Sequence, residues 1–113
     1  EVLERLRGAV APHAQIEAVV AGKGIATDPA DPWVVHVFDL VEAVAGRRPQ
    51  AAAAPYFTDG AFLKAACGDP PTLILGPGEI EQAHKTDEWC EVIKIEQAAE
   101  IYWQLARDWC LQG

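Results

Sequence analysis

The fold class follows from one short run, Thr72-Leu73-Ile74-Leu75, and from the turn Gly76-Pro77-Gly78 that comes directly after it. An apolar run bounded by turn residues predicts a strand that is buried on both faces, in a sheet covered by helices. Ligands of open α/β sheets bind in loops beyond the carboxyl ends of the strands. The sequence therefore predicts a layered α/β unit whose chemistry lies just after residue 75.

Two amphipathic helices are expected to cover this sheet. Asp31 as the cap and Pro32 at the first helical position predict one helix, which ends at Gly46. A regular apolar face from about Ile95 to Trp109, with charged residues opposite, predicts the second helix. Each has one apolar side, which needs an apolar surface to pack on.

The N-terminal quarter is expected to belong to a separate packing unit. Residues 2–10 have helical spacing with no capping residue before them, which suggests a chain cut from a longer one. Residues 15–20 predict a short strand. A stretch rich in Asp, Pro and Ala around Asp28 is typical of a linker. We therefore predict one unit over residues 1–27 and another over residues 28–113.

Composition excludes several classes of partner. Seventeen acidic residues against nine basic ones give a net charge of -8, whereas a nucleic-acid binder needs a basic face. The apolar runs are far shorter than the ~20 residues of a membrane span, and the first residues lack the order of a signal peptide. Cys67, Cys90 and Cys110 show no Cys-x-x-Cys spacing, so we expect inert thiols and a cytoplasmic location.

Three motifs follow one another in the second half of the chain. They are Tyr56-Phe57-Thr58-Asp59-Gly60-Ala61-Phe62, Leu73-Ile74-Leu75-Gly76-Pro77-Gly78 and Ala83-His84-Lys85-Thr86-Asp87-Glu88-Trp89. Their order and spacing resemble the C-terminal end of the acetylornithine deacetylase and succinyl-diaminopimelate desuccinylase family of zinc metallopeptidases. The pair Ile101-Tyr102 in the closing helix belongs to the same resemblance.

The resemblance implies the C-terminal portion of a two-domain zinc hydrolase. Residues 1–27 would be the last helix and strand of an α+β lid, or dimerisation, domain. Residues 28–113 would be the C-terminal segment of a layered α/β catalytic domain. The parent, a homodimer, would cleave N-acyl amino acids or related peptide-like amides. Deacetylase, desuccinylase and carboxypeptidase activities all stay open, because the residues that discriminate between substrates lie largely in the lid and upstream.

The resemblance also gives roles to individual residues. His84 would bind one of two zinc ions, with cobalt or manganese as alternative ions. Gly76 and Gly78 would bring backbone amides to the substrate's carboxylate, and a tight turn is the alternative reason for glycine there. Thr58 would contact substrate through its hydroxyl, although capping of the short helix after it is the favoured role.

No catalytic residue is assigned within the chain. The family's other metal ligands and its Glu-Glu pair with the general base have no counterpart here, so the chain alone is expected to be inactive. We expect Asp87 and Glu88 to be structural, and His13 and His36 to be ordinary histidines. The competing interpretation is a non-catalytic binding or dimerisation module that kept this fold.

Overall fold

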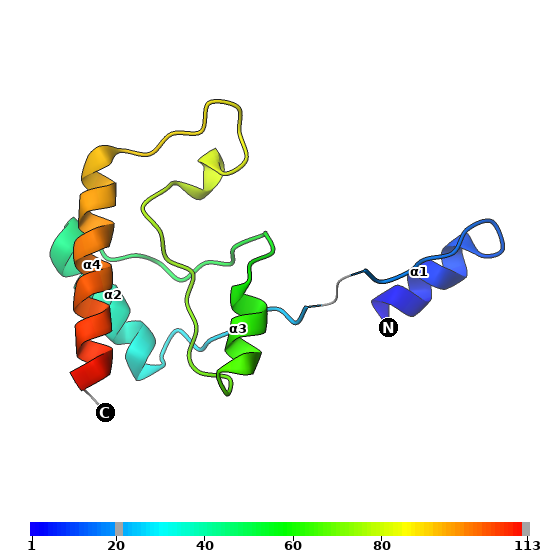
Figure 1. Ribbon diagram of the computed structural model, residues 1–113, viewed down its shortest axis with the longest axis horizontal. Helices are drawn as coiled ribbons and strands as arrows, with labels where there is room; N and C mark the ends of the chain where they lie inside the picture. Colours follow the sequence, from blue (N-terminus) through cyan, green and yellow to red (C-terminus); the bar gives the residue numbers. More distant parts are fainter. Residues whose placement is uncertain (20–21, 112–113) are drawn as a thin grey trace.

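The computed structural model describes residues 1–19 and 22–111, and all the regular structure in them is helical (Figure 1). In chain order the elements are α1 (Val2–Val10), α2 (Pro32–Ala45), α3 (Gly60–Ala66), the short 3-10 helix η1 (Ile80–Gln82) and α4 (Val92–Leu111). Within this described part, no helix is long and apolar enough to span a bilayer.

Helix α2 begins and ends where the sequence predicts. The carboxylate of Asp31 accepts a hydrogen bond from the backbone N–H of Trp33 at 2.9 Å, and Pro32 occupies the first helical position. At the other end Gly46 has a φ of 75°, a left-handed conformation that glycine adopts without steric cost. Its N–H donates to the carbonyl of Glu42, so the last turn is closed. The predicted helix is confirmed.

Helix α4 packs against α2, and together they hold the core (Figure 1). Four side chains are buried in the described part of the chain: Val34, Val37, Ala98 and Ile101. Two contacts frame this core, since Trp33 meets Trp109 edge to face at 4.9 Å between ring centroids, and His36 Nε2 lies 3.1 Å from Asp108 Oδ2. His36 therefore joins the two helices.

The two expected strands are not formed. Residues 72–75 and 15–19 have no regular structure, and Val20, the end of the earlier expected strand, lies outside the described residues. A strand exists only where its backbone N–H and C=O groups pair with a neighbouring strand. No described segment supplies such a ladder, so the regular structure of residues 1–19 and 22–111 is helical and the expected layered α/β arrangement is not confirmed.

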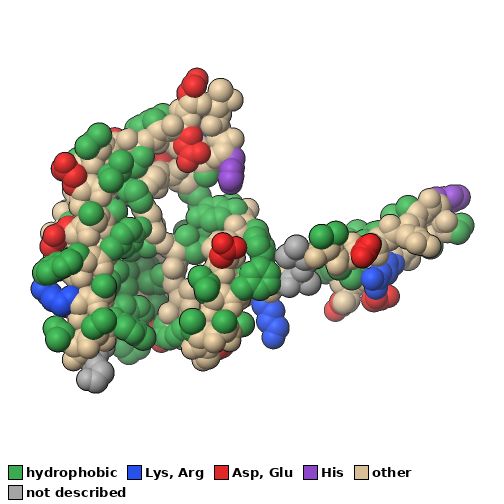
Figure 2. Space-filling model, viewed as in Figure 1, with side chains coloured by type: hydrophobic (Ala, Val, Ile, Leu, Met, Phe, Trp, Pro, Cys, Tyr) green, Lys and Arg blue, Asp and Glu red, His purple; other side chains and the backbone are tan. Residues whose placement is uncertain are grey.

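The molecule is open rather than compact. Its radius of gyration is 18.3 Å, whereas a compact chain of this length has about 13 Å. Its accessible surface is 8913 Å², against about 6,000 Å² expected for a compact protein of this mass. Large apolar side chains lie on that surface, among them Phe57, Leu63, Trp89 and Leu111. Figure 2 shows hydrophobic side chains spread over α3 and α4, with the molecule hollowed between them.

Helix α1 stands apart from this assembly. It makes no contact with another helix of the described residues, and Figure 1 shows it projecting away from α2, α3 and α4. It has no buried residue, so its amphipathic face is uncovered. This separation sets the N-terminal segment off from the packed helices.

Replacing Val34 by Ala should lower the free energy of unfolding by about 2 kcal/mol, because Val34 is only 1% exposed and the lost methyl groups leave a cavity. The matched control is Val35→Ala on the next position of α2, where the side chain is 37% exposed and the loss should be below about 1 kcal/mol. Urea unfolding followed by circular dichroism measures both. Equal losses for the two variants would contradict the packing of α2 on α4.

Candidate functional site

The candidate site is the segment that runs from the end of the apolar run at Leu75, through the Gly-Pro-Gly turn, to His84. Three side chains from the α4 region hold its first part. The hydroxyl of Tyr102 donates to the carbonyl of Leu75 at 2.7 Å. The thiol of Cys90 donates to the carbonyl of Pro77, with 3.4 Å between Sγ and oxygen. The third is an ion pair between Lys94 and Glu79.

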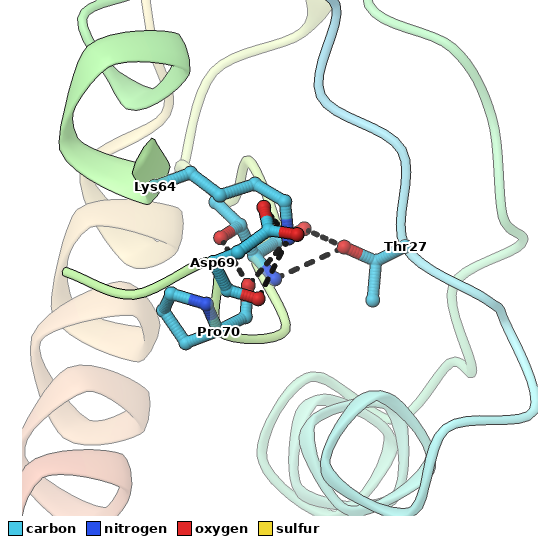
Figure 3. A network of polar contacts seen from close by, with 5 residues as sticks. Thr27, Lys64, Asp69 and Pro70 are labelled. Atoms are coloured by element: carbon cyan, nitrogen blue, oxygen red, sulfur yellow. Dashed lines mark hydrogen bonds and ion pairs between the residues drawn. The ribbon is translucent and has the colours of Figure 1, made fainter. Parts of the chain in front are cut away.

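The apolar run enters the site held by a side chain instead of a strand. The hydroxyl oxygen of Thr27 accepts from the backbone N–H of Thr72 at 3.0 Å, and the same hydroxyl donates to the carbonyl of Thr72 at 2.7 Å (Figure 3). One threonine thus satisfies both backbone groups of Thr72, as a strand partner would. No local sequence pattern indicates this role of Thr27.

Lys64 of α3 fixes the turn before the apolar run. Its ammonium donates to the carbonyl of Pro70 at 2.6 Å and lies 3.3 Å from the carboxylate of Asp69 (Figure 3). The Lys64 side chain is only 15% exposed. The hydroxyl of Thr72 also donates to the carbonyl of Pro70, at 2.9 Å. The turn and the start of the apolar run are therefore one hydrogen-bonded unit.

Thr58 opens helix α3. Its hydroxyl oxygen accepts from the N–H of Gly60 at 3.0 Å, and its carbonyl accepts from Ala61 at 3.2 Å. Thr58 thus serves the first N–H of α3 from one position before the N-cap residue, Asp59, which makes no side-chain cap bond. Thr58 and Gly76 both line one open groove of about 790 Å³, which Gly78 and His84 do not line. The structure thus brings two of the four expected site residues to a common surface.

The backbone conformation of the turn does not require glycine at positions 76 and 78. Neither has a φ in the left-handed region, and a Cβ added to either residue would meet no atom within 4 Å. A tight turn that needs positive φ is therefore not the reason for glycine at these positions. Glycine there leaves the backbone open to close approach by another molecule or segment.

His84 is exposed and has an uncommon backbone conformation. Its φ is 62°, in the left-handed region that costs a non-glycine residue about 1–2 kcal/mol. The carboxylate of Glu88 accepts from its backbone N–H at 3.2 Å, which gives Glu88 the expected structural role. Neither ring nitrogen of His84 bonds to a described residue, so the imidazole is open to a metal ion. Residues that hold such local strain gather at functional sites.

The described residues do not form a complete metal site. Among residues 1–19 and 22–111, no group of three or more His, Cys, Asp and Glu side chains converges. Asp87, three residues from His84, has a φ of 59° and belongs to the turn. His13 lies in the exposed turn after α1, and His36 pairs with Asp108. His84 could therefore serve as a single ligand of a site whose other ligands lie elsewhere.

One ion pair adjusts the charges beside the turn. The hydrogen bond from Lys94, helped by Coulomb attraction, holds the pKa of Glu79 below its ordinary value. The bond to Glu79 in turn raises the pKa of Lys94. Both shifts favour the charged forms, so the two partners attract each other at neutral pH.

Residues 6–108 match the profile of Peptidase family M20/M25/M40. The chain belongs to this family. Peptidases of the M20/M25/M40 family are generally metal-dependent. The resemblance stated from the three motifs is confirmed.

Several acetylornithine deacetylases are similar to this M20/M25/M40 chain. That of Proteus mirabilis is 40% identical over 72 residues, which are 64% of this chain and 17% of the relative. That of Yersinia pseudotuberculosis is 38% identical over 77 residues, 68% of this chain and 18% of the relative. That of Photorhabdus laumondii is 40% identical over 75 residues, with 66% and 18% covered. The chain thus spans less than a fifth of the curated relatives that it matches. No solved structure matches it.

The Thr27→Val variant should lose the two bonds to Thr72 at nearly constant volume. We expect the free energy of unfolding to fall by about 1–2 kcal/mol, since two half-buried backbone groups lose their partner. Amide hydrogen exchange at Thr72 measures the effect, and this exchange should be faster in the variant than in the wild-type chain. Thr27→Ser, which keeps the hydroxyl, should retain most of the protection. Unchanged exchange in Thr27→Val would show that the hydroxyl does not hold the segment.

The Lys94→Met variant should raise the pKa of Glu79 toward its ordinary value of about 4.3. Because Lys94 lowers the pKa of Glu79, their pair adds stability above that ordinary value and loses it as the pH falls through the lowered one. Carboxyl-carbon NMR titration measures the shift. Lys85→Met is the control, since Lys85 has no ion pair in the described part of the chain. A Glu79 titration identical in all three proteins would mean that the pair is absent in solution.

Proposed function

We propose that this chain is the C-terminal segment of a zinc-dependent amidohydrolase that cleaves N-acyl amino acids or related amides. The observation that carries the proposal is the family match over residues 6–108. The relatives named acetylornithine deacetylases make an N-acetylated amino acid the first substrate to test. A succinylated amino acid is the next, because the motifs resemble desuccinylases equally. The segment alone is inactive under this proposal.

The surface of the chain supports its assignment to a larger protein. The accessible surface of the described chain is about 3,000 Å² larger than that of a compact chain of this mass. Large apolar side chains such as Phe57, Leu63 and Trp89 lie on this surface, where the rest of a larger protein would cover them. In the proposed enzyme the remainder of the catalytic domain packs on α3, α4 and the unpaired run 72–75.

The proposed domain organisation follows the same division as the sequence. Residues 1–27 are assigned to the lid, or dimerisation, domain, and residues 28–113 to the catalytic domain. The isolation of α1 from the packed helices supports this division. Thr27 lies just before the boundary and bonds Thr72 across it, so it would link the two units. A homodimeric parent rests on the resemblance, and a cytoplasmic location rests on the spacing of the cysteines.

His84 is the proposed metal ligand. An exposed imidazole with both ring nitrogens open suits zinc, and cobalt or manganese are alternative ions. A zinc pair would polarise the substrate's amide carbonyl and activate water. The remaining ligands and the general base come from other parts of the enzyme. Within this chain, His84 is exposed, and the carboxylate of Glu88 accepts from its backbone N–H.

The substrate would be oriented by two backbone amides and one hydroxyl. The N–H groups of Gly76 and Gly78 make no hydrogen bond to a described residue, and each is open to a carboxylate. Thr58 uses its oxygen to accept from Gly60, which leaves its O–H proton to donate to a substrate oxygen in the same groove as Gly76. These three residues would bind and orient, and none of them carries a proton-transfer step.

A second candidate is a non-catalytic binding or dimerisation module. It is favoured by the absence of any converging metal-ligand cluster within residues 1–19 and 22–111. The two candidates differ in what their gene encodes. An intact mass several times that of these residues, with an upstream His-x-Asp and Glu-Glu pair, supports the hydrolase. A product of this size supports the module.

In the full-length protein, His84→Ala should lose about one zinc ion per chain and lower turnover of an N-acetyl amino acid at least about 100-fold. This limit follows because loss of a residue that merely supports a metal ligand already costs about 10- to 100-fold. Metal analysis of the purified protein and initial-rate kinetics measure the two effects.

Two controls separate ligation from folding. His13→Ala removes an exposed histidine outside the site and should leave zinc content and turnover unchanged. His84→Gly relieves the left-handed backbone but still lacks the imidazole, so it should be as defective as His84→Ala. Normal zinc content and turnover in His84→Ala would refute the proposal.

A further inference from the structure

The Gly-Pro-Gly turn is held to the α4 region from one side only. The groups that are held there are the carbonyl of Leu75, by Tyr102, and the carbonyl of Pro77, by Cys90. Leu75 directly precedes Gly76 in the chain, and Pro77 directly precedes Gly78. Each held carbonyl is therefore in the same peptide group as the N–H of the following glycine.

Peptide geometry then fixes where the intervening amides point. A trans peptide is planar, and its C=O and N–H point in opposite directions. The only cis peptide bond among the described residues is Ala11-Pro12, so the Leu75–Gly76 and Pro77–Gly78 bonds are both trans. Since both carbonyls point to the α4 region, the N–H groups of Gly76 and Gly78 point away from it.

Neither glycine is crowded by neighbouring atoms. A Cβ added to Gly76 or Gly78 would find no atom within 4 Å. No described residue accepts a hydrogen bond from either N–H, whereas buried or interacting backbone donors are nearly always paired. Two neighbouring amides that lack a partner are suited to the oxygens of a carboxylate, which accepts stronger bonds than a neutral carbonyl does.

We propose that Tyr102 and Cys90 are positioning residues that aim the amides of Gly76 and Gly78 at the free carboxylate of the substrate. This inference rests on the proposed function and adds a specificity device to it. Tyr102 of α4 and Cys90, two residues before α4, would set the preference for substrates with a free α-carboxylate over the same compounds without it. The ion pair between Lys94 and Glu79 holds the next residue of the same segment to α4.

The test uses the full-length enzyme and two substrates, an N-acetyl amino acid and its carboxamide, in which the carboxylate is neutral. Tyr102→Phe removes the hydroxyl and keeps the ring. We expect KM for the carboxylate substrate to rise about 10-fold with kcat nearly unchanged, as when a binding contact alone is weakened. KM for the carboxamide should stay within about twofold of the wild-type value, since its contact with the amides is weak from the outset.

A second pair of variants repeats the test at the other carbonyl. Cys90→Ala removes the donor to Pro77 and should raise KM for the carboxylate substrate alone, whereas Cys90→Ser keeps a donor and should restore it. Trp103→Phe is the matched control for Tyr102→Phe, because Trp103 is the neighbouring exposed aromatic and stacks on Arg107 instead of the turn. It should change neither KM.

The outcomes separate the two proposals. Equal changes of KM for both substrates, or no change in either variant, would overturn the positioning role while leaving the hydrolase proposal intact. If Tyr102→Phe fails to fold, the Cys90 pair gives the same decision. A wild-type full-length enzyme that cleaves neither substrate, nor a succinylated one, would refute the proposed function and the inference with it.

Discussion

The packing of α2 on α4 is the constraint on which the rest of this structure depends. It buries the few side chains of the described residues that are fully removed from water, and the site segment is attached to α4 and the residues just before it by polar contacts. Apolar burial is the main force that can offset the entropy of ordering a chain, and here it is concentrated at one helix pair. The site segment gains its order by being tied to α4.

Polar side chains make the hydrogen bonds to the run 72–75 that a neighbouring strand makes in a β-sheet. Thr27 satisfies both backbone groups of Thr72, Lys64 fixes the preceding turn, and Tyr102 holds Leu75 at the far end. Each bond contributes only about 1 kcal/mol, but together they determine the path of a run that has no ladder. The geometry of the candidate site therefore depends on residues that do not themselves face a ligand.

The sequence predicted local features well and long-range ones poorly. Asp31, Pro32 and Gly46 act within one or two turns of α2, so their signals were read correctly. The composition of the apolar run 72–75 predicts a strand. Strand formation also depends on a pairing partner, however, and this local pattern does not reveal one. The three motifs indicated the family, since they carry spacing as well as composition. The bonds of Thr27 and Tyr102 span 45 and 27 positions and leave no local pattern.

The two hydrogen bonds between the hydroxyl of Thr27 and the backbone of Thr72 also limit how another strand can add to this chain. An edge strand pairs through successive N–H and C=O groups, and a shift by one residue turns every side chain to the opposite face. With both groups of Thr72 occupied, an incoming strand on that side can pair only from Leu73 onward. The threonine thus shortens the exposed edge, which discourages indiscriminate edge-to-edge association, and leaves the incoming strand fewer registers to choose from.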